Sequence, residues 1–157
     1  MRWLAVTSVV LMTACAATTP LPMADRIAAE IKSDGAGPVV RRLWDSGEYD
    51  RLLDGIASGD SALIALSPAL AAGADAGAAE GLGVALARAL PRNAAAVLSA
   101  LDPRRPPISP ARVCGIPFIE GGVADVAAYR RKAEMAVERL DGASLQDPKA
   151  ACLAALQ

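Results

Sequence analysis

The chain contains no histidine. That absence excludes a Ser-His-Asp triad, a Cys-His nucleophile pair and any metal site that depends on imidazole ligands. Aromatic residues make up only 3% of the 157 residues. A platform that stacks nucleic-acid bases needs several aromatic rings, and a sugar-binding cluster needs them too, so neither is expected. No cofactor is expected either.

An excess of charge of one sign is also missing. Lys and Arg total 16, Asp and Glu total 17, and the formal net charge is −1. A chain with this balance has no strong field that would attract nucleic acid or an anionic membrane surface. Nucleic acid is therefore not an expected partner.

The N-terminus carries the most informative pattern of the chain. A charged start, Met1-Arg2, precedes an apolar run over residues 3–12 (WLAVTSVVLM). The run is too short to span a bilayer, which takes about 20 residues. A positive start, a short apolar run and small residues at the cut are typical of a secretory signal peptide. We predict a signal peptide over residues 1–15; a buried first helix is the structural alternative.

Two cleavage sites compete at the end of this leader. The segment 12–15 (MTAC) resembles the lipobox of bacterial lipoproteins, with Met where that pattern usually has Leu. The resemblance implies an acylated Cys15 and a lipid-anchored protein of the periplasm or outer membrane. The segment 14–16 (ACA) instead resembles the A-x-A site of a soluble periplasmic or secreted protein. Residues 16–22 (AATTPLP) are predicted to form a tether.

The remaining cysteines form an even pair. Cys15 belongs to the leader, which leaves Cys114 and Cys152 in an oxidising compartment. Such a pair predicts a disulfide, worth roughly 4 kcal/mol in the chain-entropy model. A redox or metal-binding pair is the weaker alternative, because the spacing is not C-x-x-C and histidine is absent.

Residues 23–157 are predicted to form one all-α domain. Apolar residues recur at helical spacing between breaks at Gly and Pro, and no segment alternates as a strand does. The pattern indicates a compact bundle of about six to eight short helices. Asp75, Asn93 and either Asp60 or Ser61 stand where N-caps are expected.

Glycine and proline predict two further local features. Gly77, Gly81 and Gly83 fall within a helical pattern, where small residues allow another helix to approach closely. Residues 102–110 (DPRRPPISP) hold four prolines and are predicted to run extended over the surface. A long amphipathic helix is expected over residues 123–140.

Two parts of the chain are similar to each other. Residues 52–70 and 82–101 each read as an apolar helix, a short break and a second apolar helix. They resemble the paired helices of HEAT-type α-solenoids, although such a stack needs three or more repeats. With its leader and the motifs at 44–47 (WDSG) and 114–117 (CGIP), the chain also resembles small uncharacterised exported proteins of proteobacteria. That resemblance implies a location and no activity.

The favoured function is non-catalytic: binding of an envelope protein partner through a helical surface. The candidate contacts are Trp44 and Tyr49, near one helix break, and the basic pair Arg104 and Arg105. As single residues, Trp44 is expected to pack in the core and the two arginines are expected to lie in a plain surface linker, so their role as contacts competes with these structural roles. A periplasmic immunity or inhibitor protein, which the chain resembles in size, compartment and class, is the alternative function.

An enzyme is not expected, although one acidic cluster had to be considered. Four acidic residues surround one helix break: Asp45, Glu48, Asp50 and Asp54. Paired carboxylates can hydrolyse glycosides. However, Arg41 precedes Asp45 by four residues and Arg51 follows Glu48 by three, which is the spacing of ordinary surface pairs on a helix. A solvated acidic face is therefore predicted, and a carboxylate-based hydrolase is the lesser alternative.

Overall fold

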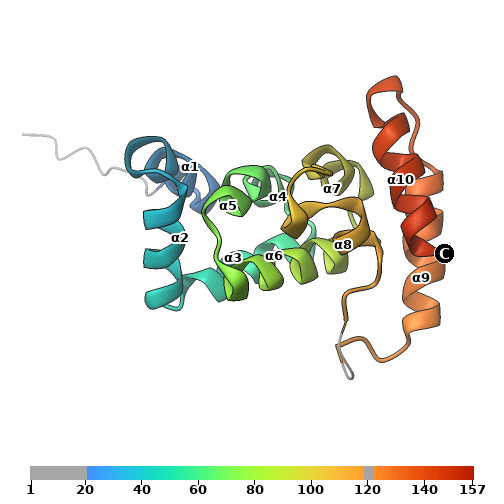
Figure 1. The fold of residues 1–157 in the computed structure, drawn as a ribbon, viewed down its shortest axis with the longest axis horizontal. Coiled ribbons are helices and arrows are strands. Elements are labelled where there is room, and N and C mark those ends of the chain that lie inside the picture. Colours follow the sequence, from blue (N-terminus) through green and yellow to red (C-terminus); the bar gives the residue numbers. More distant parts are fainter. Residues whose placement is uncertain (1–20, 119–121) are drawn as a thin grey trace, which may run out of the picture.

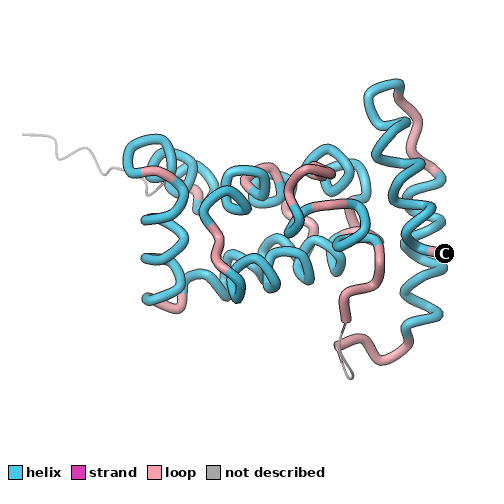
Figure 2. The backbone as a smooth tube through the Cα atoms, in the orientation of Figure 1, coloured by secondary structure: helices cyan, strands magenta, loops and turns pink. Residues whose placement is uncertain are grey.

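The computed structural model describes residues 21–118 and 122–157, and these residues are mostly helical (Figure 1). They form α1 (Met23–Asp34), α2 (Ala36–Asp45), α3 (Glu48–Ser58), α4 (Ser61–Ile64), α5 (Ser67–Gly73), α6 (Ala76–Ala89), α7 (Ala94–Ala100), α8 (Pro110–Cys114), α9 (Val126–Glu138) and α10 (Gln146–Leu156), with two 3-10 helices, η1 (Pro106–Ile108) and η2 (Ala143–Leu145). No strand occurs in these residues (Figure 2). The all-α class is confirmed. The predicted signal peptide with Cys15, and the tether up to residue 20, lie outside the described residues.

Side-chain caps begin several of the helices. Asp60, Asp75 and Asn93, all among the predicted caps, accept backbone N–H groups from the first turns of α4, α6 and α7. Asp125 does the same for α9. Each cap satisfies an N–H group that a helix start leaves without a partner. Asn93 also donates its side-chain amide to the carbonyl of Gly59 at 2.9 Å, which joins the turn before α7 to the turn before α4.

Two glycines make the connections from α2 to α3 and from α3 to α4 tight. Gly47 has φ 69° and Gly59 has φ 94°, both in the left-handed region that glycine adopts without steric cost. Each residue ends one helical segment and lets the next helix begin almost at once. The short connections keep α2, α3 and α4 as packed neighbours.

The helices form two layers with a helix pair across one end (Figure 1). α3 and α6 lie side by side along the lower edge of the view, with α5, α4 and α7 above them. α3 packs against α6 and α4 packs against α7, so the two similar segments of the sequence lie next to each other. The α9–α10 pair stands across the C-terminal end and contacts α7 and α8.

Missing side chains allow several close approaches between elements. A Cβ on Gly81 would lie 2.8 Å from Leu53 Cδ1, and a Cβ on Gly83 would lie 3.0 Å from a backbone carbonyl oxygen of η1. The prediction that these glycines admit a close neighbour is confirmed. At Gly73 the neighbour is the backbone of another helix, because a Cβ would lie 2.4 Å from the carbonyl carbon of Ala36. The backbones of α5 and α2 therefore meet directly.

The described residues contain more helices than predicted, because one segment divides and another forms a helix where none was expected. Residues 61–73 form α4 and α5 as separate helices, and Pro110 begins the short helix α8. The prediction that residues 102–110 run extended over the surface is wrong. Ile108 in η1 is fully buried, and its backbone N–H donates to the carbonyl of Arg105 at 3.1 Å. Burial of this aliphatic side chain, worth about 2 kcal/mol, draws the segment onto the domain.

The predicted disulfide is present and joins two distant helices. Cys114 at the end of α8 and Cys152 in α10 have an S–S distance of 2.06 Å, and both cysteines are fully buried. The bond fixes the last helix to the short helix that precedes α9. The ring of Phe118, just after α8, packs edge-on against Tyr129 of α9 with centroids 4.8 Å apart.

Candidate partner-binding surface

Trp44 lies in the last turn of α2 and is 52% exposed. Its neighbour Leu43 is fully buried and takes the side of α2 that faces the core. Successive side chains of a helix point about 100° apart, so Trp44 points away from that side. The indole rests on α6, where a Cβ on Gly77 would lie 3.3 Å from Trp44 Cη2. The expectation of a core position for Trp44 is therefore wrong.

Tyr49 is the residue that supports the inner side of Trp44. The two ring centroids are 5.7 Å apart, but Tyr49 is only 1% exposed. Its hydroxyl donates a hydrogen bond to the carbonyl of Ala78 at 2.9 Å, which ties α3 to α6. Burial, with a contribution from the charge of Asp75, raises the pKa of this hydroxyl and keeps it neutral. The prediction that Tyr49 contacts a partner is wrong, because its side chain has no exposed surface to offer.

Two hollows adjoin the last turns of α2. The first has a volume of about 260 Å³ and is lined by Gly37, Val40, Arg41, Trp44, Asp45, Gly73, Asp75 and Ala78. The second, of about 510 Å³, is lined by Pro38, Arg41, Arg42, Asp45 and Ser46. Arg41 and Asp45 border both hollows. An exposed indole beside a hollow, with charges of both signs at its edge, is a common composition for the centre of a protein interface.

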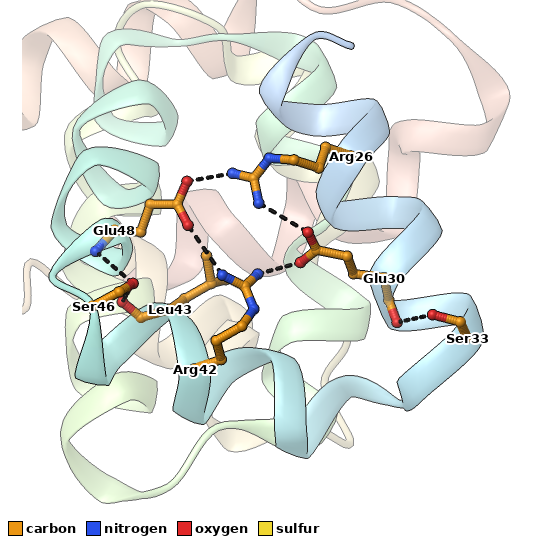
Figure 3. A network of polar contacts seen from close by, with 7 residues as sticks. All are labelled: Arg26, Glu30, Ser33, Arg42, Leu43, Ser46 and Glu48. Carbon is orange, nitrogen blue, oxygen red and sulfur yellow. Dashed lines mark hydrogen bonds and ion pairs between the residues drawn. The ribbon is translucent and has the colours of Figure 1, made fainter. Parts of the chain in front are cut away.

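A closed ring of four charged side chains holds α2 between α1 and α3 (Figure 3). Arg26 of α1 pairs with Glu30 at 2.9 Å and also with Glu48 of α3. Arg42 of α2 pairs with Glu48 at 3.1 Å and also with Glu30. Each carboxylate therefore bridges two guanidinium groups. Because Arg42 stands two residues before Trp44, the ring helps to fix the turn that carries the indole.

The ring also sets the ionisation of Glu48. Its partial burial raises the pKa, but the hydrogen bond from Arg42 and the charges of Arg26 and Arg42 act in the opposite sense. Together the arginines outweigh burial and hold the pKa of Glu48 below its usual value. Glu48 is therefore a carboxylate at neutral pH, and it is committed to structural contacts.

These ion pairs differ from the ones that local spacing predicts. In the described part of the chain, neither Arg41 nor Arg51 forms an ion pair. Glu48 pairs instead with arginines of two other helices. The remaining acids of the cluster are exposed, as predicted: Asp45, Asp50 and Asp54. Within residues 21–118 and 122–157, no group of three or more acidic or cysteine side chains is placed to hold a metal ion.

Arg104 and Arg105 lie in the segment between α7 and α8 and are paired with Asp102. The Nε atoms of Arg104 and Arg105 lie 3.5 Å and 3.3 Å from the Asp102 carboxylate. A hydrogen bond from the backbone N–H of Arg104, at 2.9 Å, and the two arginine charges lower the pKa of Asp102. The Arg104 side chain is 90% exposed. The structure thus brings Trp44 and Tyr49 together, whereas the two arginines lie elsewhere, in the turn between α7 and η1.

Comparisons with protein-family models, with curated proteins and with solved structures found no match for this chain. Among the residues that the structure describes, no helix is both long enough and apolar enough to cross a bilayer.

Proposed function

We propose that this protein is exported to the bacterial envelope, carries a lipid on Cys15, and binds another envelope protein through the surface around Trp44. The leader pattern of residues 1–15 supports export. The buried Cys114–Cys152 disulfide supports it independently, because disulfides persist mainly in oxidising compartments outside the cytosol. In this proposal residues 16–22 connect the lipid to α1.

The observation that carries the binding proposal is the rigidly held, half-exposed Trp44. The indole lies against Gly77 and Tyr49, and the ion-pair ring holds the turn of α2 that carries it. A partner therefore meets an aromatic group that is already ordered, so less conformational entropy is lost on binding. Covering half of an indole removes on the order of 100 Å² from water, which contributes about 2 kcal/mol. That contribution corresponds to roughly 30-fold in the dissociation constant.

The test of location is the intact mass of the protein recovered from membranes and periplasm of a bacterium expressing the full chain. An acylated N-terminal Cys15 is the expected result, and Cys15→Ser is the control that must lose the lipid mass. A product that starts at Ala17 would contradict the lipid anchor and would identify a soluble periplasmic protein. A product that still starts at Met1 would contradict export.

The test of binding is photo-crosslinking in living cells. A photoreactive residue replaces Asp45, beside Trp44, and in a matched control it replaces Arg131, which is exposed on α9. We expect a specific crosslinked species from position 45 that Trp44→Ala removes and Trp44→Phe partly retains. Far-UV circular dichroism must show both Trp44 variants folded. An equal crosslink from position 131, or a crosslink unaffected by Trp44→Ala, would contradict the proposal.

A further inference from the structure

A third cavity lies at the other end of the molecule, between the end of α6 and the start of α9. Its volume is about 590 Å³, larger than either hollow beside Trp44. It is lined by Arg88, Pro91, Arg92, Gly122, Val123, Ala124, Asp125, Ala128, Tyr129 and Lys132. The volume falls within the range of small-molecule sites, about 300–1,000 Å³.

Three cationic side chains border this cavity. Arg88 donates to the carbonyl of Gly122 at 3.3 Å, and Arg92 donates to the carbonyl of Arg88 at 2.7 Å. Each bond orients a guanidinium group and uses one of its five N–H donors, which leaves the others available. Lys132 adds an ammonium group from α9. Within residues 21–118 and 122–157, none of the three forms an ion pair.

The acid that lines the cavity does not neutralise these cations. Asp125 is the N-cap of α9, and its Oδ1 accepts the backbone N–H of Ala128 at 2.8 Å. Among the described lining residues, three cations stand against one carboxylate, so this lining carries a positive surplus. The N-terminal end of α9 adds to this surplus, because the helix dipole is positive there.

Part of the cavity lining is apolar, and its aromatic residue is held in place. Val123, Ala128 and the ring of Tyr129 contribute carbon surface. The Tyr129 hydroxyl donates to the carbonyl of Ala87 at 2.7 Å, and Phe118 packs against the ring. The lining therefore combines these three apolar residues, called the apolar floor below, with three cationic ones.

We propose that this cavity binds a small organic phosphate monoester, at a site distinct from the Trp44 surface. The phosphate carries close to two negative charges at neutral pH, which matches the positive surplus. Guanidinium groups bind phosphate through paired, charge-assisted hydrogen bonds, and an ammonium group adds a point charge. The organic part of the ligand lies against Val123, Ala128 and Tyr129. A bare phosphate ion leaves this floor uncovered and therefore binds more weakly.

The test is calorimetric titration of the full chain with phenyl phosphate, and with inorganic phosphate for comparison. We expect phenyl phosphate to bind at least about 10-fold more tightly than inorganic phosphate, since a phenyl ring buried on the floor removes apolar surface from water. Arg92→Gln and Lys132→Gln should each weaken phenyl phosphate at least about 10-fold, the scale of one lost charge-assisted hydrogen bond. Arg131→Gln, next to Lys132 on α9 but outside the cavity lining, is the matched control and should change binding less than about 2-fold.

Several results would overturn this assignment. One is the absence of binding at millimolar phenyl phosphate. Another is an Arg131→Gln variant that loses as much affinity as Lys132→Gln, which would indicate a general charge effect. Equal affinity for phenyl phosphate and inorganic phosphate would show that the apolar floor contributes nothing to binding. Displacement of phenyl phosphate by a lower concentration of polyglutamate peptide would identify the occupant as an acidic protein segment instead. Arg88 is left unchanged because it also borders the hollow that contains Asp50 and Asp54.

Discussion

Replacement of Gly73 by alanine should push α5 away from α2. A Cβ at this position would lie 2.4 to 2.6 Å from three backbone atoms of Ala36 and Gly37. None of these atoms belongs to a flexible side chain, so the two helices must move apart. Overpacking of this kind costs about 1–3 kcal/mol. Alanine recovers up to about 1 kcal/mol of helix propensity. Because the overlap is severe, we expect a net loss of about 2 kcal/mol.

Gly37 provides the matched control from the opposite side of the same contact. It lies in α2, and a Cβ built on it meets no atom within 4 Å. Gly37→Ala should therefore stabilise the protein by about 0.5–1 kcal/mol, since alanine favours the helix and restricts the unfolded chain. The same substitution is thus expected to lower the free energy of unfolding at Gly73 and to raise it at Gly37, although the two glycines are in contact.

The measurement is urea and thermal unfolding of the oxidised full chain, followed by far-UV circular dichroism. For a domain of this size, a loss of about 2 kcal/mol lowers the melting temperature by roughly 4–8 °C. Gly37→Ala should raise it by a few degrees. Equal melting temperatures for the two variants would refute the reasoning, and so would a Gly73→Ala variant as stable as the unchanged protein.

Three further changes test other contacts by the same unfolding assays. Glu48→Gln should destabilise by up to about 1 kcal/mol at neutral pH. This difference should fade as the pH falls through the lowered pKa of Glu48, because stability from a depressed carboxyl pKa is present only above that range; a pH-independent difference would contradict the ion-pair account. Tyr129→Phe should cost about 1–2 kcal/mol through loss of the buried bond to the Ala87 carbonyl, and an unchanged urea midpoint would show that this bond contributes nothing. Reduction of the Cys114–Cys152 bond should cost up to roughly 4 kcal/mol, whereas coincident curves for the oxidised and reduced protein would rule out a stabilising role.

Features of the fold that depend on local sequence could be predicted. Asp60 and Asn93 act as caps because a short polar side chain before an apolar helical pattern satisfies the free N–H groups of the first turn. The Cys114–Cys152 pairing could be predicted because these two cysteines remain as an even pair once Cys15 is assigned to the predicted leader. The prediction for residues 102–110 is wrong, because prolines fix the backbone locally but do not prevent the aliphatic side chain of Ile108 from reaching the core.

Features that depend on contacts between distant elements could not be predicted. Trp44 and Tyr49 were both candidate contacts, but only Trp44 is exposed, because the packing of α2 and α3 against α6 decides which aromatic ring faces inward. The partners of Arg42 lie 6 and 12 residues away, whereas spacing rules predict pairs only within one helix turn. The basic cavity combines Arg92 with Lys132 of α9, and nothing local connects these positions.

The Cys114–Cys152 bond changes what a single cut in the backbone does to this protein. The two cysteines are separated by 38 residues, so the chain between them forms a covalent ring closed by sulfur. Hydrolysis of one peptide bond inside that ring opens it but releases no fragment, and the mass of the molecule rises only by one water. A nicked copy therefore migrates as a single species on a non-reducing gel, and two pieces separate only after a reductant is added. Protease sensitivity of the chain between the two cysteines must accordingly be tested on the oxidised protein, with the reductant added only after digestion, before the gel is run.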